Sequence, residues 1–341
     1  MKAFQNVLIV SKTTRLERLI RQGIHFTPYI EQFYKKDWET ANDIHHQVIE
    51  SFYKWVQKMG MNAVIKKEND LQVEDIHDKD LCISIGGDST YLKAAGIIED
   101  STKPLLGINS DPTRRTGALC NESLNFNERE KQIPKIIEQL QTGDYTTFLR
   151  SRALFNFENP VSGVSTTRLC LNEVFAAEKD VSCTSMYRIS VDGRDMGKFK
   201  SSGIIIGTGT GSSGWLYSAR QITQMDVSTI NDIIGNQQSD AALSNNLSGL
   251  MSSSNVFPYD QDELYYFVRE GYVFDPASYA WRAEGFCKQI KVISEIIDGS
   301  VQIDGYWKMD IGIGDVFTVT ACPNQKLKCL ILNNAKSSEG Q

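Results

Sequence analysis

The sequence has no long hydrophobic run, only four histidines and no C-x-x-C pair among its seven cysteines. No apolar stretch approaches the roughly 20 residues that a membrane-spanning helix needs, so we expect no membrane partner. The histidines all lie in the first quarter of the chain without the spacing of a metal site, so no metal ligand is predicted. The odd number of scattered cysteines indicates reduced, mostly buried thiols in an intracellular protein.

The chain also lacks the excess of positive charge that nucleic-acid binding requires. It carries 36 basic and 42 acidic residues, a net charge of −6, so we expect no nucleic-acid partner. With 41% hydrophobic and 23% charged residues the composition is that of a globular protein. A length of 341 residues exceeds one ordinary core, which predicts two domains.

The apolar pattern changes near residue 146. Up to that point short, wholly apolar runs alternate with helical spacing, which predicts a Rossmann-like α/β domain with a parallel sheet over residues 1–146. The pattern of residues 147–341 predicts a mainly antiparallel β domain. The last residues of this segment could instead pack on the N-terminal domain. The expected elements of the first part are strands at 6–10, 63–67, 81–85 and 104–109 and a helix at 37–59.

The second part of the chain contains several segments that read as strands, together with Asp-Gly pairs, which are typical of hairpin turns. The polar segment 221–258 predicts a helix and a variable loop. The expected strands are 147–157, 168–177, 185–192, 203–207, 264–270, 290–297, 300–304 and 315–320. The expected hairpin turns are Asp192-Gly193, Asp298-Gly299 and Asp304-Gly305.

Polar residues follow two apolar runs of the first domain. The segment GGDST (86–90) follows LCISI, and Asn109 begins a polar segment after LLGI. In an open parallel sheet, ligands bind beyond the carboxyl ends of the strands. Glycines allow close backbone approach to a phosphate, and a helix N-terminus offers free N–H groups. The structural alternative is an Asp or Ser cap after a tight turn, so both readings stay open here.

Two further polar segments lie in the second domain. Asn172 and Glu173 interrupt an apolar strand, where a ligand would satisfy them, although an edge strand or a bulge would serve as well. The loop GTGTGSSGW (207–215) formally contains G-x-G-x-x-G. It lacks the βαβ context and the acid of a dinucleotide fingerprint, and it lacks the G-K-[ST] of a Walker A loop. It offers backbone donors and hydroxyls suited to a nucleotide.

Taken in this order, the motifs resemble those of the NAD kinases. GGDST matches that family's GGDGT loop, LLGIN its second strand, LNEV its Asn-Glu pair, and GTGTGSSGW its Gly/Thr-rich loop. The likeness is greatest to the mitochondrial branch, in NVLIVSKTTR (6–15), NSDPTRRTG (109–117) and KSSGIIIGTGTGS (200–212). It covers nearly the whole chain and is weakest at 221–260.

The resemblance implies an enzyme that transfers the γ-phosphoryl of ATP, with Mg²⁺, to the 2′-hydroxyl of the adenosine ribose of NAD. NAD would bind between the two domains, and Asp88 would be the base that faces the hydroxyl. By the same resemblance the phosphate loop and the nucleotide-binding residues are Gly86, Gly87, Ser89, Thr90, Asn109, Asn172, Glu173, Thr208, Thr210, Gly211, Ser212 and Ser213.

Ser89 departs from the family, which has glycine at that position. If the backbone there has a positive φ, a serine costs roughly 1 kcal/mol or more, yet we expect the loop to tolerate it. Two alternatives remain at this stage. One is a lipid kinase of the diacylglycerol or sphingosine type, which shares the GGDGT loop but does not need the Asn-Glu pair. The other is an NAD-binding protein without catalytic activity, which Ser89 alone favours.

The resemblance also implies a location and an assembly. It favours the mitochondrial matrix, with the cytosol as the competing expectation because the apolar segment near the N-terminus reads as a strand and no targeting segment is evident. The family generally forms homo-oligomers, which makes a homodimer the expectation. The preference for NAD or NADH and the use of other phosphoryl donors are not predicted.

Overall fold

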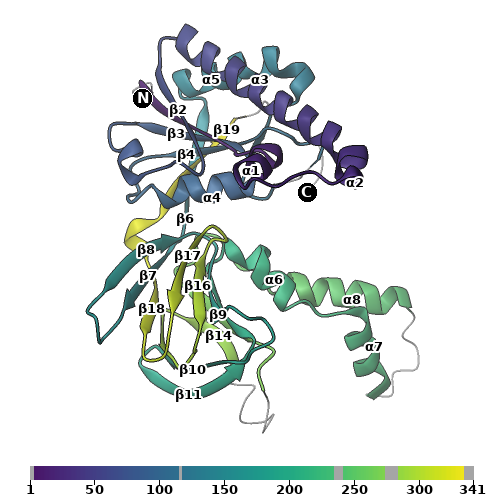
Figure 1. Cartoon of the computed structure of the whole chain (residues 1–341), viewed down its shortest axis with the longest axis vertical. Coiled ribbons are helices and arrows are strands. Elements are labelled where there is room, and N and C mark those ends of the chain that lie inside the picture. The colour runs from purple at the N-terminus through teal and green to yellow at the C-terminus, as the bar shows by residue number, and fades with distance from the viewer. Residues whose placement is uncertain (1–3, 115–116, 234–240, 273–282, 334–341) are drawn as a thin grey trace. The chain divides into compact units, whose positions relative to one another are not determined.

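The computed structural model describes residues 4–114, 117–233, 241–272 and 283–333, without the side chains of 241–243 (Figure 1). The chain divides into two compact units, Met1–Leu149 with Leu327–Gln341, and Arg150–Lys326. The second unit begins at Arg150, and the last described strand belongs to the first unit.

The first unit is built on a seven-stranded sheet of order β2-β1-β3-β4-β19-β6, with β5 paired to β4. The pairs β1–β2, β1–β3, β3–β4 and β4–β19 are parallel, which confirms the predicted α/β class. The strands are β1 (Asn6–Ser11), β2 (Asn62–Lys67), β3 (Leu81–Gly86), β4 (Leu105–Asn109), β5 (Glu122–Ser123), β6 (Tyr145–Arg150) and β19 (Leu327–Leu332).

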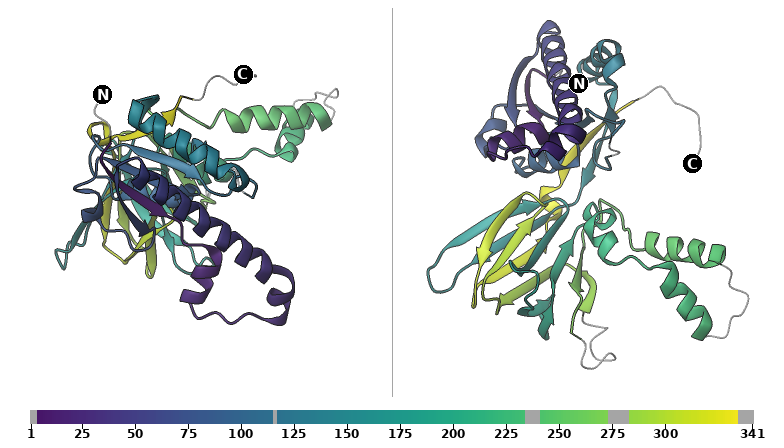
Figure 2. Two further views of the ribbon diagram at one scale, coloured as in Figure 1. Left: turned by 90° about the horizontal axis from the view of Figure 1, so that it is seen from above. Right: turned by 45° about the vertical axis from the view of Figure 1, so that its right-hand side comes forward.

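Helices cover both faces of this sheet, which is why β3 and β4 are buried along their whole length. The apolar stripes of α3 and α5 pack on one face and α4 lies on the other (Figures 1 and 2). The helices are α1 (Arg15–Arg21), α2 (Pro28–Ile30), a π-helical turn (Glu31–Lys35), α3 (Lys36–Lys58), α4 (Asp88–Gly96) and α5 (Arg129–Thr142), with 3₁₀ turns at Val73–Ile76 and Phe126–Glu128.

The second unit contains two six-stranded sheets, of order β11-β10-β15-β18-β7-β8 and β14-β13-β12-β9-β16-β17. Neighbouring strands in both sheets are antiparallel. One hydrophobic core lies between their inner faces. The strands are β7 (Ala153–Glu158), β8 (Ser165–Cys170), β9 (Glu173–Glu178), β10 (Ser185–Val191), β11 (Arg194–Ser201), β12 (Gly203–Gly207), β13 (Leu264–Arg269), β14 (Glu284–Cys287), β15 (Gln289–Ser294), β16 (Gly299–Ile303), β17 (Trp307–Ile311) and β18 (Val316–Ala321).

The predicted strands of this part are correct in type but not always in extent. The expected strand 147–157 is β6 and β7, separated at Ser151, whose backbone N–H bonds to Tyr259 instead of a ladder partner. The expected strand 168–177 is likewise β8 and β9. Asp192-Gly193 and Asp304-Gly305 do turn hairpins, with positive φ at both residues of each pair. Asp298-Gly299 does not, since Gly299 starts β16.

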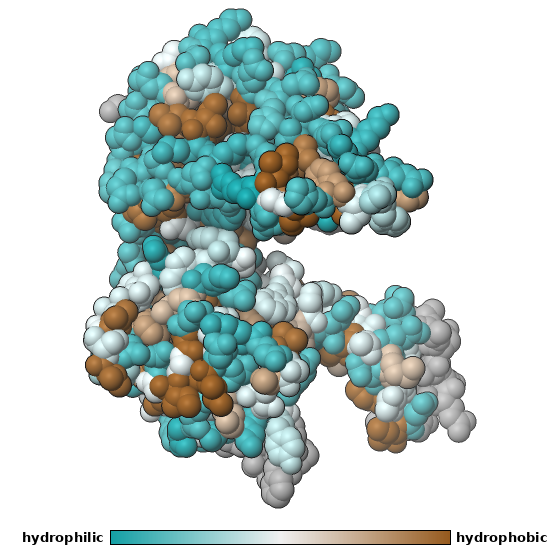
Figure 3. Space-filling model, in the orientation of Figure 1, coloured by the Kyte–Doolittle hydropathy of each residue, from teal (hydrophilic) through white to brown (hydrophobic). Residues whose placement is uncertain are grey.

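The polar segment 221–258 is more helical than predicted. After α6 (Trp215–Ala219) come α7 (Gln224–Ile233) and α8 (Ala241–Ser253), which extend from the sheets of the same unit (Figure 2). Figure 3 shows hydrophobic surface on these helices. Their exposed apolar side chains include Met225, Ile230, Ile233, Leu250 and Met251. In the described ranges no helix is long and apolar enough to cross a membrane.

Candidate functional site

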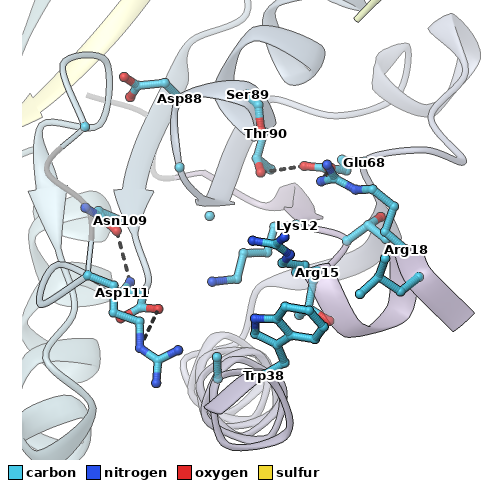
Figure 4. A pocket seen from close by; sticks show the side chains of 18 of the residues that line it. Lys12, Arg15, Arg18, Trp38, Glu68, Asp88, Ser89, Thr90, Asn109 and Asp111 are labelled. Atoms are coloured by element: carbon cyan, nitrogen blue, oxygen red, sulfur yellow. Dashed lines mark hydrogen bonds and ion pairs between the residues drawn. The ribbon is translucent and has the colours of Figure 1, made fainter. Parts of the chain in front are cut away.

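A cavity of about 950 Å³ opens in the first unit (Figure 4). It lies at the carboxyl ends of β1, β3 and β4, where an open parallel sheet places its ligands. Its walls include every site residue predicted for this unit: Gly86, Gly87, Asp88, Ser89, Thr90 and Asn109. The remaining wall residues are Lys12, Thr13, Thr14, Arg15, Arg18, Leu19, Asp37, Trp38, Ala41, Glu68, Asp111, Arg114 and Gly117.

The surroundings of Gly86 and Gly87 in the loop differ. A Cβ on Gly86 would lie 2.4 Å from Thr90 Oγ1 and 2.9 Å from Lys12 Cβ, so packing requires a glycine there. A Cβ on Gly87 would meet no described atom within 4 Å, and Gly87 has an extended φ of −122° that other residues adopt. Packing therefore does not require a glycine at position 87. The open space beside its backbone is available to a ligand.

Asp88 is the first residue of α4, and Gly87 is its N-cap. The carboxylate accepts hydrogen bonds from the backbone N–H groups of Ala118 at 2.9 Å and Leu119 at 3.0 Å. A Cβ on Gly117 would come within 2.6 Å of Asp88 Oδ1. Backbone donors and a glycine from the loop after β4 thus fix the orientation of this carboxylate, which is turned away from Lys12 in Figure 4.

Ser89 is exposed and is the second residue of α4, in right-handed helical conformation. The described non-glycine residues with positive φ are Asp192, Glu270 and Asp304. The backbone strain considered for Ser89 is therefore absent, because a helix start needs no glycine at this position.

Thr90 is buried beneath the loop and donates a hydrogen bond to Glu68 Oε2 at 2.5 Å. Glu68 follows β2 and is itself buried, and Lys93 Nζ lies 3.0 Å from its other oxygen. The Thr90 hydroxyl is thereby committed to a protein partner. Pairing with Lys93 and Thr90 offsets the cost of burying the Glu68 charge.

Asn109 ends β4 and shapes the next turn. Its side-chain oxygen accepts the backbone N–H of Asp111 at 2.9 Å, and the side chain is buried. Arg114, further along the same turn, lies 2.8 Å from Asp37 of α3 and 3.7 Å from Asp111. Asn109 thus organises a turn that is tied to α3 across the cavity.

Sequence reasoning missed the basic and aromatic residues of this cavity. Lys12 follows β1 directly and extends into the cavity, with Arg15 and Arg18 on α1 (Figure 4). The Arg15 guanidinium lies 4.6 Å from the ring centroid of Trp38 on α3. The position of Lys12 at the carboxyl end of a buried strand was a usable signal, whereas the approach of Arg15 to Trp38 depends on the tertiary fold.

A buried histidine lies behind the cavity. His45 Nε2 is 2.9 Å from Ser11 Oγ at the end of β1, and Nδ1 is 3.3 Å from Ser110 Oγ after β4. Burial, followed by the charges of Lys12, Lys67 and His46, holds the pKa of His45 well below its usual range. A neutral imidazole therefore joins α3 to two strand ends.

The Asn-Glu pair of the second unit surrounds a buried carboxylate. Asp304 accepts backbone hydrogen bonds from Leu171 at 2.9 Å, Asn172 at 2.6 Å and Glu173 at 3.2 Å. Among the described residues, Asn172 Oδ1 and Glu173 Oε2 are buried without a hydrogen-bond partner. Burial first, and then the charge of Asp304, raise the pKa of Glu173 to about 8. Buried polar atoms left in this way are candidates for ligand contact.

The Gly/Thr-rich loop packs directly on this pair. A Cβ on Gly211 would lie 2.2 Å from the carbonyl oxygen of Asn172, and one on Gly209 would lie 1.9 Å from that of Pro258. The backbone N–H of Thr208 donates to the Asn172 carbonyl at 2.9 Å. Close packing accounts for these glycines, so the formal G-x-G-x-x-G spacing does not reflect a dinucleotide fingerprint.

The hydroxyls of the loop also have protein partners. Thr208 donates to the Leu171 carbonyl, and Ser212 donates to that of Gly209 at 2.7 Å. Thr210 accepts from Arg150 at 3.3 Å, and the exposed Ser213 donates to the Thr210 carbonyl at 3.4 Å. These residues hold the loop shape, and Asn172 and Glu173 retain the unsatisfied atoms.

Comparison with known proteins places these motifs in a family context. Residues 9–145 match the family model described as "ATP-NAD kinase N-terminal domain". The chain is 25% identical to "NAD kinase 2, mitochondrial" of Xenopus tropicalis over 85% of this chain and 79% of that protein. It is 23% identical to the protein of the same name from Homo sapiens, over 96% of this chain and 84% of that protein.

Solved structures show the same fold. "Yeast NADH Kinase complexed with NADH" aligns with a TM-score of 0.61 at 14% identity, over 97% of this chain and 84% of that chain. An NAD kinase from Archaeoglobus fulgidus in complex with ATP aligns with a TM-score of 0.57 at 16% identity, over 96% of this chain and 94% of that chain.

Proposed function

We propose that this chain, whose residues 9–145 carry the N-terminal domain of the NAD kinases, phosphorylates NAD with ATP to give NADP. The family predicted from the motifs is confirmed by that match and by relatives along most of the chain. One observation supports the activity above others: within the matched domain, Asp88 begins α4 beside an open glycine, in a cavity at the strand ends.

The reaction forms a bond between the ribose 2′-oxygen and the γ-phosphorus while the bond from that phosphorus to the β–γ bridging oxygen breaks. ADP leaves, and the hydroxyl proton passes to a base. Asp88 is proposed as that base, since a carboxylate in hydrogen-bond reach orients the hydroxyl and takes its proton late. Its bonds to Ala118 and Leu119 leave lone pairs on both oxygens.

The phosphates of ATP are proposed to approach the backbone at Gly87, where no side chain obstructs them. The α4 N-terminus adds N–H groups that lack intrahelical partners. Mg²⁺ prefers phosphate oxygens, water and one or two carboxylates. The described residues contain no group of three acidic, His or Cys side chains that could hold a metal. The ion is proposed to enter with ATP and would neutralise charge on the phosphates.

Asn172 and Glu173 are proposed to bind the dinucleotide. Their unsatisfied buried oxygens support this, because a ligand amide or hydroxyl would remove the cost of burying them. Thr208, Thr210, Gly211, Ser212 and Ser213 are proposed to act with them mainly by shaping the loop, given their internal hydrogen bonds.

The names of the relatives support a location, and exposed side chains support an assembly. We place the protein in the mitochondrial matrix because the vertebrate relatives are mitochondrial by name, and a C-terminal fluorescent fusion that stays diffuse in the cytosol would contradict this. We also infer a homodimer, supported by the exposed apolar side chains of α7 and α8. Ile230→Asp with Ile233→Asp should then yield monomers in light scattering, whereas unchanged mass would place any interface elsewhere.

The experiment that tests the function is NADP formation by the purified chain with ATP, Mg²⁺ and NAD. Labelling of NAD and not of diacylglycerol separates it from the lipid-kinase alternative, which the family match already disfavours. Tight NAD binding in calorimetry without any NADP would instead identify a protein that binds the substrate but lacks catalysis.

A further inference from the structure

The cavity of the first unit holds more positive charge than its own acids engage. Of its basic residues, Arg114 is paired with Asp37 at 2.8 Å. Arg18 has one acidic neighbour, Glu68, at 4.0 Å, and Lys93 approaches that carboxylate more closely, at 3.0 Å. Arg15 has no acidic partner within 4.0 Å in the ranges that the structure describes, and its guanidinium rests on Trp38. Arg15 and Arg18 are therefore available to an anion.

An aromatic surface adjoins these two arginines. Trp38 lines the cavity, with Arg15 over its ring and Tyr34 stacked at a centroid distance of 5.7 Å. Phe26 meets the same ring edge-on at 6.0 Å. Tyr34 is in turn 5.9 Å from Tyr29. Each ring of this platform contacts a neighbouring ring, and the platform adjoins Arg15 and Arg18, which lack close acidic partners among the described residues.

A ligand that satisfies both features carries several negative charges next to a planar aromatic group. Guanidinium groups bind phosphate oxygens bidentately, and indole rings attract both cations and stacked bases. If the Arg15 guanidinium leaves the ring for a phosphate, it uncovers a face of Trp38 for a base. Inorganic polyphosphate would engage the cations alone and leave that ring without a role.

We propose that Arg15, Arg18 and Trp38 form the phosphoryl-donor subsite and select a nucleoside triphosphate over inorganic polyphosphate. This rests on the proposed function, since the donor must reach the same cavity as Asp88. The arginines hold the phosphates, and Trp38 contacts the base in the place that Arg15 vacates. They are specificity-determining residues and leave the chemical step to Asp88.

The test measures binding by calorimetry, with a non-hydrolysable ATP analogue and with inorganic tripolyphosphate as separate probes. Arg15→Gln and Arg18→Gln should each lower the affinity for both probes about tenfold or more. Trp38→Leu should lower the affinity for the ATP analogue by a similar factor and change the affinity for tripolyphosphate by less than about twofold. Arg21→Gln, on the same helix and paired with Asp70 at 3.5 Å, is the matched control and should bind both probes like the wild type.

Kinetics separate this subsite from the function on which it rests. In NADP formation the three variants should raise the KM for ATP and leave the KM for NAD unchanged. If the wild type forms NADP but Arg15→Gln and Arg18→Gln bind the analogue normally, the subsite is wrong while the kinase function stands. If Trp38→Leu loses equal affinity for both probes, the proposed selectivity for a nucleoside triphosphate is also wrong. If the binding pattern holds but no NADP forms, the function fails and the subsite stands.

Discussion

Asp88 Oδ1 accepts a hydrogen bond from the backbone N–H of Leu119 at 3.0 Å, which ties the start of α4 to the loop that follows β4. The neighbouring N–H of Ala118 binds the second oxygen. A carboxylate held through both oxygens cannot rotate freely, so its orientation is set before substrate arrives. Such fixed groups contribute to phosphoryl transfer through positioning.

The two glycines before Asp88 should respond differently to alanine. Gly86→Ala should lower the free energy of unfolding by about 1–3 kcal/mol, because its Cβ would collide with Thr90 and Lys12. Gly87→Ala should cost less than about 1 kcal/mol but reduce kcat/KM for ATP about tenfold, as the methyl occupies the phosphate approach. Denaturant unfolding and NADP kinetics on both variants check this. Normal kinetics in Gly87→Ala would contradict the phosphate role.

Ser89 should not limit activity. Because it occupies a helical position with no positive φ, Ser89→Gly should give equal or higher kcat while lowering stability by about 0.5 kcal/mol through helix propensity. Steady-state kinetics with thermal unfolding measure both effects. If neither the wild type nor Ser89→Gly forms NADP, the kinase assignment fails.

Glu173 should govern the affinity for NAD. Glu173→Ala should raise the KM for NAD strongly and leave the KM for ATP nearly unchanged, because the buried oxygen that would contact the dinucleotide is lost. Glu178→Ala, a partly exposed acid on the same strand, serves as the control. A raised KM for ATP with an unchanged KM for NAD would remove this assignment.

Glu173 should also make stability depend on pH. Its pKa is raised from 4.5 to about 8, so the folded state binds more protons than the unfolded state between these values. The free energy of unfolding should therefore fall as the pH rises through this window. Glu173→Gln should flatten this dependence in denaturant unfolding at several pH values. An equally steep dependence in the variant would place its origin elsewhere.

His45 should stabilise the base of the cavity as a neutral hydrogen-bonding group. His45→Leu leaves Ser11 and Ser110 without their imidazole and should cost about 1–3 kcal/mol. His46→Leu, on the exposed side of α3, should cost less than about 1 kcal/mol. Since the pKa of folded His45 lies well below 6.5, its contribution should decline as the pH falls below that value and the unfolded state takes up a proton.

Local sequence patterns predicted the parts of the molecule that depend on periodicity and strand ends. The wholly apolar runs predicted the parallel sheet, and the strand-end rule placed Asp88 and Asn109 at one cavity. The sequence did not predict the role of Asp304 beneath the Asn-Glu pair, because an Asp-Gly pair indicates only a hairpin turn. Asp304 does form that turn, and its carboxylate also accepts hydrogen bonds from three backbone N–H groups. The contact between Arg15 and Trp38 joins separate helices, and no local pattern encodes it.

The measurement that tests the account most directly is NADP formation by Asp88→Asn. Asparagine preserves the shape and can still accept a loop N–H, so fold and KM for NAD should be largely kept. It cannot take the hydroxyl proton, so kcat should fall by about 10² or more. Asp195→Asn, an exposed acid of β11, should match the wild type. Full NADP formation by Asp88→Asn would contradict the assignment of Asp88 as the base.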